Sequence, residues 1–139
     1  MVWVVDTCVI LDILDCHPLF AEVSSRALQE NLDEILEIAP ASYVELAPAF
    51  NGDAREQDAF LDALWIRRDF GLDLNGVLAA HGWWYEHILR KRKGEAPKRP
   101  LADVLIGAYA LQKGGLITRN ESDFRTLFPK LPIYNPANH

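Results

Sequence analysis

The stretch VWVVDTCVILD, residues 2–12, decides the fold and raises the first question about function. Its apolar run Val2 to Val5 is typical of a strand that is buried on both faces of a parallel sheet. The run leads directly into Asp6, although an ionised carboxylate is costly to bury without a partner. Two interpretations of Asp6 are open. It caps the following helix, a position that aspartate favours, or it is a functional group placed at the end of the strand.

Length and composition predict one domain over residues 1–139, because 139 residues that are half hydrophobic suffice for one packed core. The lack of a membrane-spanning run and of a secretory signal predicts a cytoplasmic protein. No apolar run approaches the roughly 20 residues of a membrane-spanning helix, so we expect no membrane partner. The first apolar stretch does not read as a secretory signal, since Asp6 and Asp12 interrupt it. Cys8 and Cys16 form no CxxC pattern, and we expect both to be reduced.

Apolar spacing and turn residues predict an alternation of strands and helices. Strands are expected at 2–6, 35–39, 71–74, 116–118 and 132–134. Helices are expected at 9–14, 18–31, 42–50, 54–68, 76–93, 101–113 and 123–128. Such alternation is typical of an α/β fold with a mostly parallel sheet and helices on both faces.

Four acidic residues fall where such a fold would gather them, since ligands of open parallel sheets bind outside the carboxyl ends of the strands. Asp6 ends the first predicted strand, and Glu45, Asp103 and Asp123 lie at or near helix starts. Each has an ordinary alternative. Glu45 is at a capping-box spacing from Ser42, Asp103 would complement a helix dipole, and Asp123 would be an N-cap.

The four acids together predict a metal site. Clustered carboxylates raise one another's pKa unless a cation lies between them. Mg²⁺ and Mn²⁺ prefer oxygen ligands, and with one or two ions such a cluster activates water and stabilises an in-line displacement at phosphorus. We therefore predict Asp6, Glu45, Asp103 and Asp123 as metal ligands and catalytic residues.

Several stretches resemble the PIN-domain nucleases, especially the VapC-type toxins: VVDTCVILD (4–12), SYVELA (42–47), PLADVLIGAYALQKGGLITRNESDFRTLFP (100–129) and PIYNP (132–136). The resemblance implies a PIN-like three-layer α/β/α sandwich with a short, mostly parallel central sheet. It also implies a Mg²⁺- or Mn²⁺-dependent endoribonuclease that cleaves RNA, a homodimer, and a cognate antitoxin protein as partner.

The resemblance also assigns roles to single residues. Asp6, Asp103 and Asp123 would hold metal, and Glu45 would bind a second ion or orient the attacking water. Hydroxyl and amide groups that orient these carboxylates would come from Thr7, Thr118 and Asn120. The sequence departs from the family at Cys8, where Asn or Ser is frequent.

Charge is distributed unevenly along the acidic chain. The net charge is −6, yet residues 90–99, RKRKGEAPKR, hold six of the 14 basic residues and one of the 20 acidic ones. This run predicts RNA contacts by Arg90, Lys91, Arg92, Lys93, Lys98 and Arg99, and Arg119 is a further candidate. The alternatives are a solvated helix end, an antitoxin contact and, for Arg119, a salt bridge.

Two other function classes remain open. A PIN fold without activity would act only as a binding module. A phosphoryl-transfer domain of the receiver or haloacid-dehalogenase type would also place an Asp after a buried first strand. The dehalogenase pattern needs a second Asp two residues later, where Cys8 stands, and the sequence shows no paired acids and late Lys of a receiver.

Overall fold

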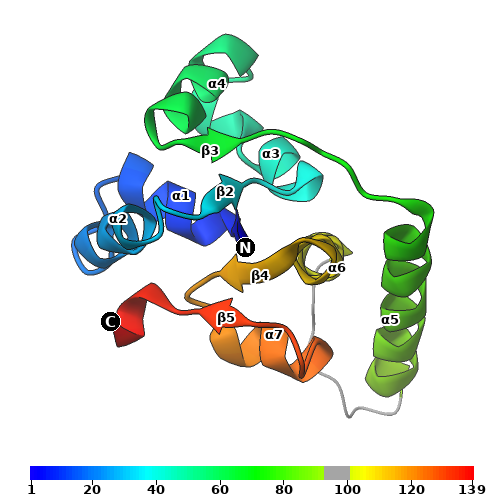
Figure 1. The fold of residues 1–139 in the computed structure, drawn as a ribbon. Coiled ribbons are helices and arrows are strands. Elements are labelled where there is room, and N and C mark those ends of the chain that lie inside the picture. The colour runs from blue at the N-terminus through cyan, green and yellow to red at the C-terminus, as the bar shows by residue number, and fades with distance from the viewer. Residues whose placement is uncertain (93–100) are drawn as a thin grey trace.

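The computed structural model describes residues 1–92 and 101–139, without the side chains of His87 and residues 90–92, and shows a five-stranded sheet flanked by helices (Figure 1). The sheet order is β3-β2-β1-β4-β5 and every neighbouring pair is parallel. The strands are β1 (Val2–Val5), β2 (Ile35–Glu37), β3 (Ile66–Arg67), β4 (Gly114–Ile117) and β5 (Ile133–Tyr134). This topology confirms the predicted α/β fold with a short, parallel central sheet.

The helices that connect these strands lie on both faces of the sheet (Figure 1). They are α1 (Thr7–Leu14), α2 (Ala21–Glu30), α3 (Pro40–Glu45), α4 (Ala54–Ala63), α5 (Leu74–Arg92), α6 (Leu101–Lys113) and α7 (Glu121–Leu127). Short 3₁₀ helices occupy Ala47–Phe50 and Pro136–Asn138. Within the described ranges, none of the helices combines the length and apolar character needed to cross a membrane.

The sheet separates two hydrophobic clusters, because successive side chains of a strand point to opposite faces. Val4 and Leu116 pack into one cluster with residues of α6 and α7. Val5 and Ile117 pack into the other with residues of α1, α2 and α4. The central strands are thus covered on both sides, and the predicted burial of the β1 run is confirmed for Val4 and Val5, whereas Val2 and Trp3 are only half-buried.

Strand β3 lies at Ile66–Arg67, so the predicted strand at 71–74 is wrong. Helix α4 ends at Ala63, and Trp65 turns the chain with a left-handed φ of 61°. That conformation is uncommon for a residue other than glycine. The turn delivers Ile66 into the core at 1% exposure. Burial of Ile66 therefore outweighs the helical pattern that extends to residue 68.

Helix α6 leads into β4 without an intervening loop. Gly114 has a φ of 156°, and a Cβ there would lie 2.7 Å from the Val2 carbonyl oxygen on the adjacent strand. The two glycines end the helix as predicted but also belong to the strand, which starts two residues earlier than expected. Because α6 ends where β4 begins and packs along β1 and against α3, the helix that follows β2, its first turn lies toward the edge where the strands end.

A buried carboxylate also fixes α6 against the sheet. Glu37 at the end of β2 is 4% exposed, and its Oε1 accepts a hydrogen bond of 2.9 Å from the Tyr109 hydroxyl. The Lys113 ammonium lies 3.5 Å from the same oxygen and 2.7 Å from Asp69. Burial and the Glu37 charge raise the pKa of Tyr109, so its hydroxyl stays protonated and remains a donor at neutral pH.

We predict that Gly107→Ala lowers the free energy of unfolding. A Cβ at Gly107 in α6 would lie 2.1 Å from Cε2 of Phe128, a fully buried ring. Overpacking of this kind costs about 1–3 kcal/mol. Gly82→Ala in α5 is the matched control, because a Cβ there meets nothing within 4 Å and alanine favours a helix by up to about 1 kcal/mol. Urea denaturation should show opposite signs for the two variants.

Candidate functional site

Asp6 lies at the carboxyl end of β1, the central strand of the sheet, and is 4% exposed. Its Oδ2 accepts hydrogen bonds from the Thr118 hydroxyl at 2.7 Å and from the Cys8 thiol at 3.4 Å. Its Oδ1 accepts from the Thr7 backbone N–H at 2.8 Å. The chain therefore supplies three donors to one buried carboxylate, one from Thr118 just after β4 and two from the start of α1.

Both interpretations of Asp6 describe part of its environment. Asp6 is the N-cap residue of α1, with extended backbone dihedrals and a side chain that accepts the Thr7 N–H. A cap alone does not require the bonds from Thr118 and Cys8, and Thr118 is 112 residues distant in sequence. The cap thus orients the carboxylate, and the neighbouring strand holds it at the sheet edge.

The electrostatic environment of Asp6 differs from that of the other buried acids. Burial raises the pKa of Asp6, hydrogen bonds from Thr118, Cys8 and Thr7 lower it, and the Glu45 charge raises it, with a net upward shift. Asp12 and Glu37 are equally buried, but each has a basic partner: Arg119 pairs with Asp12, and Lys113 pairs with Glu37. No Lys or Arg among the described residues forms an ion pair with Asp6.

Glu45 joins Asp6 through Thr7. The Thr7 hydroxyl donates to Oε1 of Glu45 at 2.9 Å, while the Thr7 N–H bonds Asp6. The capping-box alternative for Glu45 is wrong, because α3 starts at Pro40 and Glu45 is its last residue. Ser42 instead lies within α3, where its hydroxyl is buried and has no hydrogen-bond partner among the described residues.

Asp103 and Asp123 lie on helices that start at the same edge of the sheet. Asp103 is in the first turn of α6, which packs against β1 and α7, and it is half-buried. Asp123 is in the first turn of α7, which starts four residues after β4 ends, and it is also half-buried. The N-cap alternative for Asp123 is wrong, since Asn120 holds that position.

The four acids are not in metal-binding contact as they stand. In residues 1–92 and 101–139, no three side chains of His, Cys, Asp or Glu are arranged to hold an ion. The structure brings Asp6, Thr7, Glu45 and Thr118 into one hydrogen-bonded group and places the elements that bear Asp103 and Asp123 at the same edge. The predicted ligand set stays a prediction, and its donors are all oxygens, as a hard cation requires.

Cys8 has a clear role despite its departure from the resembled family. Burial and the nearby Asp6 charge raise the pKa of the Cys8 thiol to about 12. The thiol therefore remains protonated at neutral pH and donates to Asp6, as a serine hydroxyl would at that position. Cysteine is a poor ligand for Mg²⁺, and here it serves the carboxylate through a hydrogen bond.

The segment after β4 contains both expected and unexpected contacts. The Thr118 hydroxyl accepts from the Asn120 N–H at 3.0 Å while it donates to Asp6, so it forms the turn and orients the carboxylate. The Asn120 side chain is exposed and makes no cap bond. Arg119 forms a two-point ion pair with Asp12, a partner that the sequence analysis did not identify.

The basic run at 90–99 cannot be compared with the structure in the same way. Residues 93–99 lie outside the described residues, and residues 90–92 are described without their side chains.

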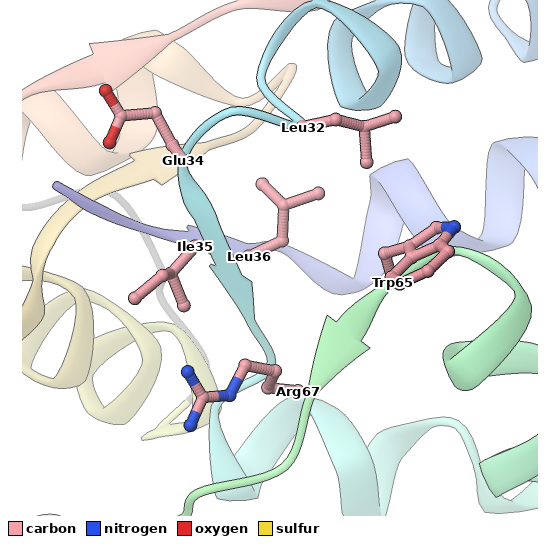
Figure 2. A pocket seen from close by; sticks show the side chains of 6 residues that line it. All are labelled: Leu32, Glu34, Ile35, Leu36, Trp65 and Arg67. Carbon is pink, nitrogen blue, oxygen red and sulfur yellow. The ribbon is translucent and has the colours of Figure 1, made fainter.

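A pocket of about 470 Å³ lies at the opposite edge of the sheet, where β2 and β3 begin (Figure 2). Leu32, Ile35, Leu36 and Trp65 supply most of its lining. Its one acid, Glu34, is paired at 2.7 Å with the amino group of Met1. This pocket holds no acidic cluster among the described residues, so the candidate site is the Asp6 edge.

Comparisons with known proteins show the fold. A chain of VapBC2 from Rickettsia felis, bound to a DNA fragment from their promoter, matches with a TM-score of 0.73 at 16% identity, covering 97% of this chain and 98% of that one. VapBC-1 from nontypeable Haemophilus influenzae matches with 0.71 at 19% identity, covering 99% of each chain. FitAcB from Neisseria gonorrhoeae matches with 0.70 at 19% identity over the full length of both chains. These likenesses confirm the PIN-like three-layer fold.

Sequence comparison adds nothing to this likeness. No family model matches the chain, and no curated protein matches it.

We predict that Asp6→Asn stabilises the metal-free protein at pH 7. The folded-state pKa of Asp6 lies above its ordinary value of 3.8, so the folded protein retains the Asp6 proton to a higher pH than the unfolded chain. The stability that this group contributes is complete below pH 3.8 and is lost as pH rises through the raised pKa. The gain from Asp6→Asn should therefore shrink on acidification toward pH 4.

Chemical denaturation in EDTA at several pH values measures this difference. Asp33→Asn, at an exposed carboxylate, is the matched control and should leave the pH profile unchanged. A variant less stable than the parent at pH 7 would show that Asp6 is principally a helix cap.

Proposed function

We propose that this chain is a VapC-type toxin and acts as a Mg²⁺- or Mn²⁺-dependent endoribonuclease that hydrolyses RNA phosphodiester bonds. The observation that carries the proposal is Asp6, a buried carboxylate with three neutral hydrogen-bond donors and an acidic neighbour, Glu45. A buried acid in that setting is stabilised by a cation from solution. Whole-length likeness to chains of toxin–antitoxin complexes supports the proposal through the fold.

In the proposed mechanism, Asp6, Asp103 and Asp123 hold the ion, and Glu45 binds a second ion or orients the water. A bound divalent ion would lower the pKa of water and offset the charge that develops on the phosphate. Thr7 acts on two of these groups, since its N–H bonds Asp6 and its hydroxyl bonds Glu45. Thr118 holds Asp6 from β4, and Asn120 is positioned by its backbone bond to Thr118.

The other function classes are less well supported. A receiver domain has the strand order 2-1-3-4-5, whereas this sheet has the order 3-2-1-4-5. A dehalogenase-type phosphotransferase would need a carboxylate where Cys8 donates its thiol proton to Asp6. A catalytically silent PIN fold is the remaining alternative, and the organised hydrogen bonds around Asp6 favour an active site over it.

The proposed partners follow from charge and from the similar complexes. In the cytoplasm, the basic run at 90–99 would contact the RNA backbone, because it concentrates positive charge on an otherwise acidic chain. A cognate antitoxin is the second proposed partner, since the similar structures of VapBC2 and FitAcB are complexes. The same basic run would also attract an acidic antitoxin segment.

We predict that the purified protein cleaves RNA with Mg²⁺ or Mn²⁺, that EDTA abolishes cleavage, and that excess ion restores it. Asp6→Asn and Asp103→Asn should each reduce the cleavage rate by at least ~10-fold, the lower range for disturbing a metal site. Gel analysis of RNA products measures the rates. Asp33→Asn is the matched control at an exposed carboxylate on the opposite edge of the sheet. Undiminished cleavage in EDTA would contradict the metal site, and no cleavage under any condition would favour the silent binding module.

We also propose that the chain forms a homodimer through α5. This helix lies beside α6 at one side of the molecule (Figure 1). Leu74, Val77, Leu78 and Tyr85 are exposed along it. These positions recur at helical spacing, so they form an apolar stripe of the kind that marks a protein contact. A second copy that presents the same stripe would cover it, as two-fold symmetric interfaces do.

We predict that Leu74→Lys/Leu78→Lys shifts the protein from dimer to monomer, because two charges would face each other across a two-fold interface. Light scattering after size exclusion measures the molar mass. Leu19→Lys is the control, since Leu19 is equally exposed before α2 and lies outside the stripe. A parent protein that is monomeric at high micromolar concentration would refute the proposed dimer.

A further inference from the structure

A partly buried ion pair begins one residue beyond Thr118 of the candidate site. The Arg119 guanidinium donates from Nε to Oδ2 of Asp12 at 2.6 Å and from Nη2 to Oδ1 at 2.8 Å. Two parallel bonds of this kind fix the orientation as well as the distance of both groups. Asp12 is 3% exposed and also accepts a 2.8 Å bond from the buried hydroxyl of Ser24. The pair is therefore ordered from α1, α2 and the segment after β4 together.

The Phe20 ring further restricts the guanidinium. The Arg119 Cζ atom lies 4.0 Å from the ring centroid, which is the geometry of a cation–π contact. The Arg119 side chain keeps 21% exposure. Two of its nitrogens and one of its faces are thus engaged inside the protein, which leaves little of the guanidinium to contact a phosphate.

The ion pair closes a ring of contacts that includes Asp6. Asp6 caps α1, and Asp12 lies six residues further along that helix, about 9 Å at 1.5 Å per residue. Asp12 holds Arg119, and the residue before Arg119 is Thr118, whose hydroxyl donates to Asp6. The end of β4 is therefore tied to α1 at two points, Thr118 to Asp6 and Arg119 to Asp12. Two attachments fix the orientation of a segment, whereas one would let it rotate.

We propose that Arg119 is a positioning residue: its ion pair with Asp12, stacked on Phe20, holds the Thr118 hydroxyl on Asp6 and so fixes the carboxylate in its metal-binding orientation. The metal-binding part of this inference rests on the proposed function. The positioning of the Thr118 hydroxyl and of the nearby Cys8 thiol does not rest on the proposed function, since it follows from the contacts alone. The inference also gives Arg119 a role other than the RNA contact considered from the sequence.

The first experiment measures Mn²⁺ affinity by calorimetry without RNA. Asp12→Asn removes the charge of the partner, and Arg119→Lys keeps the positive charge but loses the two-point geometry. Both should weaken Mn²⁺ binding by ~10-fold, the lower end of the range for partners that orient metal ligands. Arg125→Lys is the matched control, because Arg125 lies nearby in sequence, in α7, but pairs with Glu121.

The second experiment separates positioning from RNA contact. RNA affinity is measured in Ca²⁺ at several salt concentrations for the parent, Asp12→Asn, Arg119→Lys and Arg119→Ala. A positioning residue predicts parental RNA affinity and salt dependence in all three variants. A phosphate contact predicts instead that Arg119→Ala lowers the slope of log affinity against log salt by ~0.7 while Mn²⁺ affinity is unchanged. That second pattern would overturn the inference.

The third experiment requires no metal. The Cys8 Sγ lies 3.8 Å from the Thr118 hydroxyl oxygen and donates to Asp6, so its environment reports where Thr118 lies. In a Cys16→Ser background, which removes the exposed thiol, a thiol reagent should modify Cys8 several-fold faster in Asp12→Asn and Arg119→Lys than in the parent or Arg125→Lys. Parental rates in both variants would overturn the inference even if the protein cleaves RNA. If the two variants react faster but the parent protein binds no Mn²⁺, the proposed function is refuted and the positioning of Thr118 by Arg119 is retained.

Discussion

The arrangement of the candidate site depends on the burial of one carboxylate at the end of the central strand. Asp6 follows two fully buried valines and is itself nearly inaccessible. Burial of a charge is tolerated only when hydrogen bonds replace water, and here a backbone N–H, a hydroxyl and a thiol do so. These donors come from α1 and from β4, which explains why the polar residues around the site lie in two distant stretches of the sequence.

Sheet topology then determines what else lies at that edge. Because every strand is parallel, all carboxyl ends meet on one side, and each following helix begins there. Helix α6 reaches the same side by a different route, since it ends where β4 begins and packs back along the sheet against β1 and α3. The first turns of α6 and α7 thus bring acidic residues to the edge that Asp6 occupies. The opposite edge carries the apolar pocket at Trp65, whose acid is paired with the amino terminus.

Periodicity predicted the elements that have strong local signals, and it failed where a tertiary contact decided the outcome. The apolar run of β1 and the spacing of α6 identify these elements without a structure. By contrast, β3 starts where Trp65 adopts a left-handed conformation so that Ile66 reaches the core, and no local pattern encodes that turn. Asp6 could be singled out because an ionised carboxylate is costly to bury at the end of an apolar strand. Its partner Thr118 was found through the motif after β4, whereas the Asp12–Arg119 pair joins two motifs and is visible only in three dimensions.

The three most buried acids are compensated in two different ways. Glu37 and Asp12 each take up a cation of the protein, and Asp6 has only neutral donors and an acidic neighbour. Arg119 stands one residue from Thr118, close enough for its charge to act on Asp6. Asp12 therefore does two things at once: it orders the end of β4, and it holds with two bonds the guanidinium whose charge reaches Asp6.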